Sequence, residues 1–247
     1  MTRSTPRAQD ETAERTASAF AHVDCWIFDL DNTLYSFEAR LFDQIDRRMT
    51  SFIAETLAVS AEEANRLRAV YWDQYGTTLN GLMSLHDTPP EAFLDYVHDI
   101  DLGALEACRH RRAALAALPG RRIVHTNGSR GHAARVLAKL GIEDLFDQVF
   151  AIEDSAYAPK PAEQAYAAVI RGAEVEPRRA AFFEDTARNL ETPHRLGMRT
   201  VFTPTGCRRA EADRDQPYVE FVAEDLTGFL TRLTAPTTAH ATGEAVR

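Results

Sequence analysis

Apolar and polar positions alternate along this chain in two different ways. Residues 22–35 contain a short apolar run with β-branched and aromatic side chains, which predicts a buried strand ending in a turn at Asp31, Asn32 and Thr33. After residue 113 such runs return regularly, each followed by an amphipathic stretch. The predicted strands, with their closing turns, cover residues 121–128, 147–154, 178–186 and 198–204, and the predicted helices cover residues 129–141, 161–172 and 187–197. This alternation predicts a parallel sheet with right-handed crossovers.

The segment between the first strand and the later ones has the pattern of helices. Ser60 and Glu63 have the spacing of a capping box ahead of an apolar helix face over residues 64–75. Pro89 and Pro90 interrupt the pattern and can start another helix. A helical insert is therefore expected after the first strand.

These patterns together predict an α/β protein with a Rossmann-like parallel sheet, helices on both faces of the sheet and a small all-helical cap. The core is assigned to residues 21–36 and 114–233, and the cap to residues 37–113. Residues 1–20 and 234–247 are polar without apolar periodicity, and they are predicted to be disordered tails.

Composition narrows the classes of function. The 247 residues include 28 Lys and Arg against 37 Asp and Glu, and the net charge of −9 argues against a nucleic-acid-binding surface. The three cysteines lie far apart, no apolar stretch approaches about 20 residues, and residues 1–20 lack the apolar segment of a secretory signal. We expect a cytoplasmic protein, monomeric or homodimeric, that binds neither nucleic acid nor a membrane.

Two acidic pairs follow predicted strands. Asp29 and Asp31 share one side of an extended segment, and Glu184 and Asp185 end the strand at 178–186. Either pair has a simpler interpretation, because a D-x-D turn can be solvated and Glu184-Asp185 can cap the next helix. Two acidic pairs at the ends of neighbouring buried strands are costly without a cation, however. Mg²⁺, which prefers oxygen ligands, is the expected one.

Two further segments offer groups that could bind an anion. Thr126 and Asn127 precede Gly128, where a hydroxyl and successive backbone N–H groups can form an anion-binding turn or a turn without a ligand. Lys160 lies between two prolines in a chain that has 26 arginines and only one other lysine, Lys139. A loop lysine is usually solvated, but here it could supply a compact positive charge.

Taken in order, these segments resemble a known superfamily. F-D-L-D-N-T-L-Y at 28–35, T-N-G at 126–128, A-P-K-P at 158–161 and F-F-E-D at 182–185 resemble the haloacid dehalogenase-like hydrolases. The resemblance spans about residues 22–204 and includes the helical insert that these proteins use as a cap. It implies a Mg²⁺-dependent phosphomonoesterase that acts on a small phosphorylated metabolite through an aspartyl-phosphate intermediate.

The resemblance also implies roles for individual residues. Asp29 would be the nucleophile, and Asp31 the general acid and base, with a raised pKa. Mg²⁺ would be held by Asp29, Asp185 and the backbone carbonyl of Asp31. The phosphate would be held by Thr126, Asn127 and Lys160, and the surrounding support would come from Glu184 and Asn189.

Within the superfamily, the sequence is most similar to pyrimidine 5′-nucleotidases, which implies UMP or CMP as substrate. The similarity lies in Asn32 and Tyr35 of D-N-T-L-Y and in cap residues 75–82 and 97–101, whereas Glu184 and His125 depart from several relatives. The residues expected to select the substrate are Asn32, Tyr75, His86 and His98. The cap is not enriched in aromatic residues, so its rings can equally form a helix–helix core.

Other functions stay open at this point. Another small metabolite, such as pyridoxal phosphate, a sugar phosphate or phosphoglycolate, could be the substrate. A haloacid dehalogenase would leave Asp31 and the Glu184-Asp185 pair without a role, and a receiver-like phospho-acceptor module would lack the long insert. A catalytically inactive binding protein would not need the full set of side chains.

Overall fold

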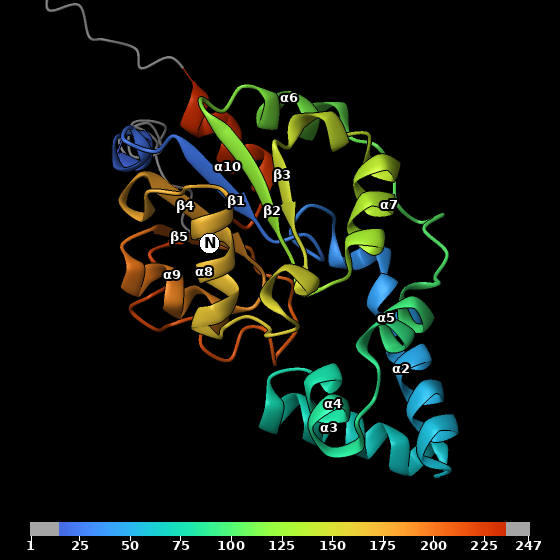
Figure 1. Ribbon diagram of the computed structural model, residues 1–247. Helices are drawn as coiled ribbons and strands as arrows, with labels where there is room; N and C mark the ends of the chain where they lie inside the picture. Colours follow the sequence, from blue (N-terminus) through green and yellow to red (C-terminus); the bar gives the residue numbers. More distant parts are fainter. Residues whose placement is uncertain (1–14, 236–247) are drawn as a thin grey trace, which may run out of the picture.

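The computed structural model describes residues 15–235, and these residues confirm the predicted α/β fold. Six parallel strands form one sheet in the order β3-β2-β1-β4-β5-β6. The strands are β1 (Cys25–Phe28), β2 (Arg121–His125), β3 (Gln148–Phe150), β4 (Ala180–Glu184), β5 (Arg199–Phe202) and β6 (Phe221–Val222). In Figure 1, β1 lies between β2 and β4 near the middle of the sheet.

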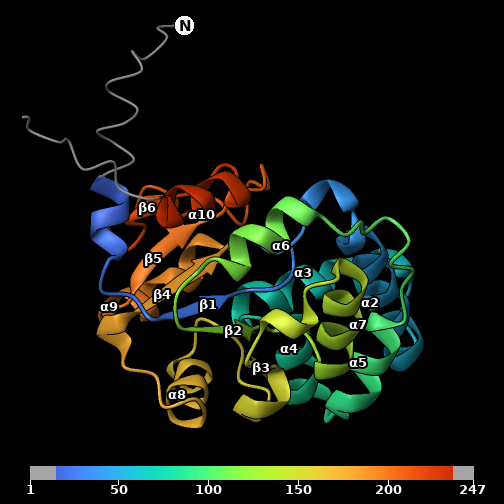
Figure 2. The same cartoon turned by 90° about the horizontal axis from the view of Figure 1, so that it is seen from above.

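Alternation along β1 divides the core into two layers. Trp26 and Phe28 face the first layer, whereas Cys25 and Ile27 face the second. Figure 2 shows the sheet between the helices of these two layers. The first layer holds α6 (Arg109–Ala116), α7 (Arg130–Leu140) and α10 (Leu226–Thr234), and the second holds α8 (Glu163–Gly172) and α9 (Glu191–Leu196). Both faces are covered, as predicted.

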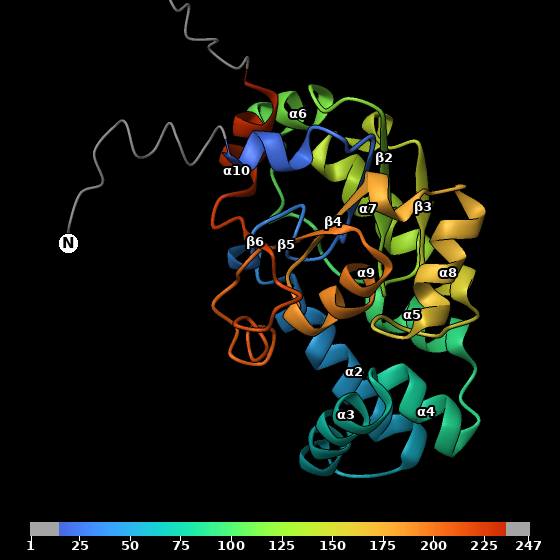
Figure 3. The ribbon, with the colours of Figure 1, turned by 90° about the vertical axis from the view of Figure 1, so that its left-hand side faces the viewer.

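The insert after β1 forms helices that project from the sheet (Figures 1 and 3). They are α2 (Leu41–Leu57), α3 (Ala61–Tyr75), α4 (Thr78–His86) and α5 (Pro90–His98). Their shared core also includes Ile152 from the short helix η3 (Ile152–Ser155), so the cap touches the sheet domain. The Ser60 hydroxyl accepts the N–H of Glu63, as the capping box predicts.

The structure differs from the sequence prediction at several edges. Residues 15–20 are helical and bury Phe20 against Phe221, with ring centroids 4.9 Å apart, so the prediction of a disordered tail is wrong there. β6 and α10 were not predicted. α6 packs with α10 on the sheet, although the expected cap range 37–113 includes part of it. Residues 1–14 and 236–247 lie outside the described residues. No helix within 15–235 is long and apolar enough to cross a membrane.

Candidate active site

A cavity of about 420 Å³ opens between the cap and the carboxyl ends of the strands. Parallel sheets place strand ends at one edge, and this is where such folds bind ligands. The cavity is lined by all of the predicted strand-end residues: Asp29, Asp31, Thr126, Asn127, Lys160, Glu184 and Asp185. Segments more than 150 residues apart in the sequence thus meet in one site.

Lys160 is the cation at the centre of this site. Its side chain is 1% exposed, and Nζ donates to Asp29 Oδ1 at 2.6 Å, Glu184 Oε2 at 2.7 Å and the backbone carbonyl of His125 at 2.9 Å. Burial alone would lower the pKa of Lys160, but the two carboxylates outweigh it and raise the pKa. All three N–H hydrogens of Lys160 are used by protein acceptors in this structure.

Asn127 holds the backbone of Lys160 from the neighbouring strand end. Its Oδ1 accepts the N–H of Lys160 at 2.8 Å, and its Nδ2 donates to the Lys160 carbonyl at 3.4 Å. The side-chain amide of Asn127 thus uses its oxygen and one of its two N–H hydrogens on Lys160, and the second N–H hydrogen could still reach a phosphate oxygen. Thr126 Oγ1 accepts the N–H of Gly128 at 2.9 Å, which leaves its O–H free to donate into the cavity.

Three buried carboxyl groups could hold a metal ion. Oxygens of Asp29, Glu184 and Asp185 lie within 4.8 Å of one another. Burial raises the pKa of Asp29 to about 8 despite the charge of Lys160, and burial with the charges of Glu184 and Asp29 raises that of Asp185 well above its usual range. Asn32 has a left-handed backbone with φ of 61° and donates to Asp185 at 3.4 Å. This hard-oxygen cluster fits a divalent cation.

The pKa of Asp31 is shifted down, whereas the expectation was an upward shift. Burial acts to raise it, but the charge of His132 and the hydrogen bonds from His132 and Tyr35 outweigh burial and lower the pKa to about 2. The Tyr35 hydroxyl and His132 Nε2 lie 2.7 and 2.8 Å from Asp31 Oδ1. The expectation of a raised pKa is wrong because it took into account only repulsion between the acidic residues.

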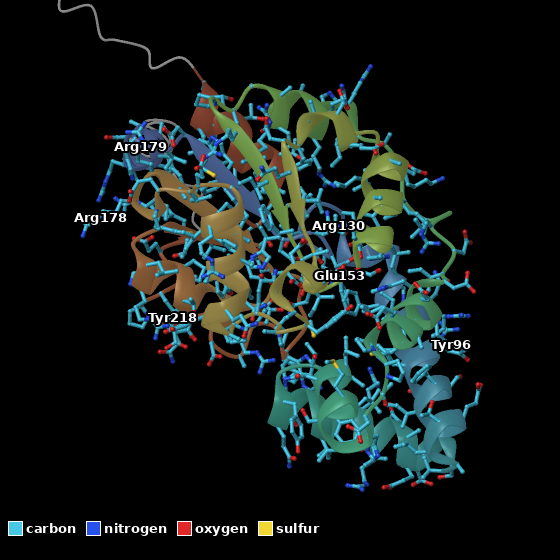
Figure 4. The ribbon with its side chains drawn as sticks, viewed as in Figure 1. Tyr96, Arg130, Glu153, Arg178, Arg179 and Tyr218 are labelled. Carbon is cyan, nitrogen blue, oxygen red and sulfur yellow. The ribbon has the colours of Figure 1, made fainter. Side chains whose placement is uncertain are left out.

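His132 is a site residue that sequence reasoning missed. It lies in the first turn of α7, whose start is held by the Ser129 hydroxyl and by the Glu153 carboxylate, which accepts the N–H of Arg130 at 3.0 Å (Figure 4). The usable signal was its position four residues after Gly128, one helical turn beyond the predicted anion-binding turn.

The cap places the predicted selectivity residues differently. His98 lines the cavity, but Tyr75 packs in the cap core and His86 is exposed with its Nε2 2.7 Å from the Tyr71 hydroxyl. Neither Tyr75 nor His86 lines the cavity, so the structure does not bring these two residues to the site. Other aromatic residues of the cap helices do line it, namely Phe42 of α2, Trp72 of α3 and Phe93 of α5.

Two arginines of the sheet domain reach Trp72. The guanidinium carbon of Arg188 lies 3.8 Å from the ring centroid, and that of Arg209 lies 4.7 Å away. Arg188 Nε is buried without a hydrogen-bond partner within residues 15–235. Asn189, expected to orient the acidic pair, has a buried Oδ1 that is likewise unpaired in the described chain. That role therefore finds no contact to support it.

The family is identified by comparison with known proteins. Residues 23–197 match the family described as haloacid dehalogenase-like hydrolase. The chain belongs to this family. "Phosphate metabolism protein 8" of Saccharomyces cerevisiae is 28% identical over 136 residues, which cover 50% of this chain and 42% of that protein. The chain thus matches less than half the length of this curated relative.

Solved structures of family members share the fold at low sequence identity. The HAD phosphatase from Thermococcus onnurineus aligns with a TM-score of 0.55 and 18% identity over 81% of this chain and 93% of that one. A haloacid dehalogenase-like protein of unknown function from Agrobacterium tumefaciens aligns with a TM-score of 0.51 and 19% identity over 85% of this chain and 95% of that one. A dehalogenase solved with an intermediate complex aligns with a TM-score of 0.54 and 14% identity over 86% of this chain and 97% of that one. Phosphatase and dehalogenase share this fold, so the choice between them depends on the site.

Proposed function

We propose that this family member is a Mg²⁺-dependent phosphomonoesterase that uses Asp29 as its nucleophile. The observation that carries the proposal is the cluster of Asp29, Glu184 and Asp185 beside Lys160. Halide displacement from a haloacid needs no such cluster. A phosphate dianion approaching a carboxylate needs concentrated positive charge nearby.

The reaction would proceed in two steps. An oxygen of Asp29 attacks phosphorus, and the bond from phosphorus to the ester oxygen breaks. The leaving alkoxide takes the proton that Asp31 carries in the substrate complex, where the phosphate dianion beside it favours the protonated carboxyl group. Water then attacks phosphorus, passes a proton to Asp31 and releases Asp29 with inorganic phosphate. Burial acts to raise the pKa of Asp31, but His132 and Tyr35 lower it, so Asp31 has to take up its proton when the phosphate dianion binds beside it.

Mg²⁺ would be held by the side chains of Asp29 and Asp185 and by the backbone carbonyl of Asp31. When bound, it would reduce the repulsion between Asp29 and the phosphate dianion and stabilise transition-state charge. Lys160 keeps Asp29 and Glu184 in place, and the Thr126 hydroxyl would donate to a phosphate oxygen.

The substrate would be a small phosphorylated metabolite. We place pyrimidine nucleoside monophosphates first, because of the D-N-T-L-Y element and because the lining of the cavity includes aromatic and guanidinium groups. Arg188 could donate to a pyrimidine carbonyl, since its Nε has no hydrogen-bond partner in the described chain. Phosphoglycolate, a sugar phosphate and pyridoxal phosphate are the alternative substrates.

The test is a panel of phosphomonoesters with Mg²⁺. Phosphate release from UMP and CMP is expected, and Asp29→Asn should abolish it while circular dichroism stays unchanged. The matched control is Asp87→Asn, since Asp87 is exposed at the end of α4 in a left-handed conformation that Asn tolerates. Halide release from 2-haloacids without phosphate release from any ester would overturn the proposal in favour of a dehalogenase.

A further inference from the structure

Both hydrogen bonds to the Asp31 side chain fall on the same oxygen. Tyr35 and His132 lie 2.7 and 2.8 Å from Oδ1, and Oδ2 accepts no hydrogen bond from the described residues. A Cβ added at Gly128 would lie 3.4 Å from Oδ2 and 3.2 Å from Thr126 Oγ1. Oδ2 therefore faces the Thr126–Gly128 turn on the phosphate side of the cavity.

The His132 ring has little freedom to move. Its side chain is fully buried, and the ring stacks on His98 with centroids 4.4 Å apart and planes 14° apart. Ser129 Oγ lies 3.0 Å from His98 Nδ1 and also accepts the N–H of His132. Neither His132 nor Tyr35 lines the cavity, so each can reach a bound ester only through Asp31.

This arrangement joins the cap to the acid–base group. His98 is the last residue of α5 in the cap, and its carbonyl accepts a hydrogen bond from Arg135 of α7. The His98 ring then packs on the His132 ring, which contacts Asp31. A chain of direct contacts thus runs from the cap helix to the carboxyl group that would exchange protons in the reaction.

We propose that His132 is a positioning residue for Asp31. Together with Tyr35, it holds Oδ1 of Asp31 so that Oδ2 points at the reacting ester. His98 of the cap in turn holds the His132 ring in place. The inference rests on the proposed function for its kinetic consequence. The role needs a hydrogen-bond donor at the place of Nε2 and does not need a group that titrates. Gln supplies such a donor and Leu does not.

The kinetic test compares His132→Leu with His132→Gln in rapid-mixing assays with p-nitrophenyl phosphate. Its leaving group departs without a proton, so the first step does not depend on Asp31. His132→Leu should release about one p-nitrophenol per active site in a burst and lose about 100-fold in steady-state turnover, because a misplaced Oδ2 slows the water step. His132→Gln should recover most of that turnover. The matched control, His110→Leu on exposed α6, should behave as the wild type.

Several outcomes would overturn the inference. Unchanged turnover in His132→Leu would do so, as would a loss that Gln does not restore. Crystal structures of the two variants give a readout independent of activity: the Asp31 carboxyl should turn in His132→Leu and keep its orientation in His132→Gln. An unchanged carboxyl in the Leu variant contradicts the inference. Absence of any p-nitrophenol release by the wild type and the control would count instead against the proposed phosphomonoesterase.

Discussion

The ammonium group of Lys160 and the carboxylate of Asp29, 131 residues apart in sequence, lie 2.6 Å from each other where solvent barely reaches. A buried pair of this kind is strongly coupled, because removal of one partner leaves the other charged group without compensation. Glu184 accepts from the same ammonium group at 2.7 Å. The stability of the fold and the proposed chemistry thus depend on one side chain.

Lys160→Met should destabilise the protein by about 3–5 kcal/mol, because it strands two buried carboxyl groups. Urea unfolding measures this, and Lys139→Met on the exposed face of α7 is the matched control. Lys160→Arg should fold poorly or lose most of its activity, because a planar guanidinium does not fit a space shaped for one nitrogen and three acceptors. Near-wild-type activity of Lys160→Arg would contradict the assignment.

Mg²⁺ should stabilise the protein more at high pH than at low pH. The pKa of Asp29 is about 8 in the folded protein against an ordinary value of 3.8, so the folded state binds more protons between these values. Without metal, stability should therefore fall as the pH rises through this window. Metal binds the ionised carboxylates, so the rise in Tm on adding Mg²⁺ should be larger at pH 8.5 than at pH 6. Asp185→Asn should remove most of this difference.

Trp72→Leu should raise KM for the proposed nucleotide substrate by about 2- to 30-fold, because Arg188 loses a cation–π contact that positions it in the cavity. Steady-state kinetics measure the change. The matched control is Tyr96→Leu in the cap. The guanidinium carbon of Arg48 lies 4.5 Å from the Tyr96 ring centroid, but Tyr96 does not line the cavity. An equal effect in Tyr96→Leu would show that the cap as a whole was perturbed.

Gly120→Ala should destabilise the protein by about 3 kcal/mol or more. Gly120 has φ of +80°, and an added Cβ would lie 2.1 Å from the Asp24 carbonyl oxygen. Gly131→Ala is the opposite case, since Gly131 lies in α7 with no atom within 4 Å of an added Cβ, and it should stabilise by about 0.5 kcal/mol. Thermal unfolding of both variants checks the pair, and a neutral Gly120→Ala would contradict the close approach of these two backbone segments.

The parts of the fold that the sequence predicted are those where a short segment contains its own signal. The apolar runs that end at Phe28 and Glu184 form the strands β1 and β4, in which every residue is buried, so the sequence pattern alone was enough to predict them. β6 has only two residues, Phe221 and Val222, one of them exposed, so no periodicity could show it. Phe20 is buried by Phe221 and Trp26, partners that only the tertiary fold brings near.

The candidate site divides in the same way. Asp29, Lys160 and Asp185 stand out because charged groups interrupt apolar or proline-flanked segments. His132 has no such mark among eight histidines, and its contact with Asp31 joins residues 101 positions apart. The pKa of Asp31 is lowered largely by that contact. The pKa was predicted to be raised because the sequence did not reveal His132 as a neighbour of Asp31.

The contrast between the two lysines has a practical consequence. Lys139 is exposed on α7, whereas Lys160 is enclosed by its three acceptors. An amine-directed dye or crosslinker should therefore react with Lys139 of the folded protein rather than with Lys160. Attachment at Lys139 would tether the protein to a surface or report on its motions without a chemical change at the carboxylates that surround Lys160.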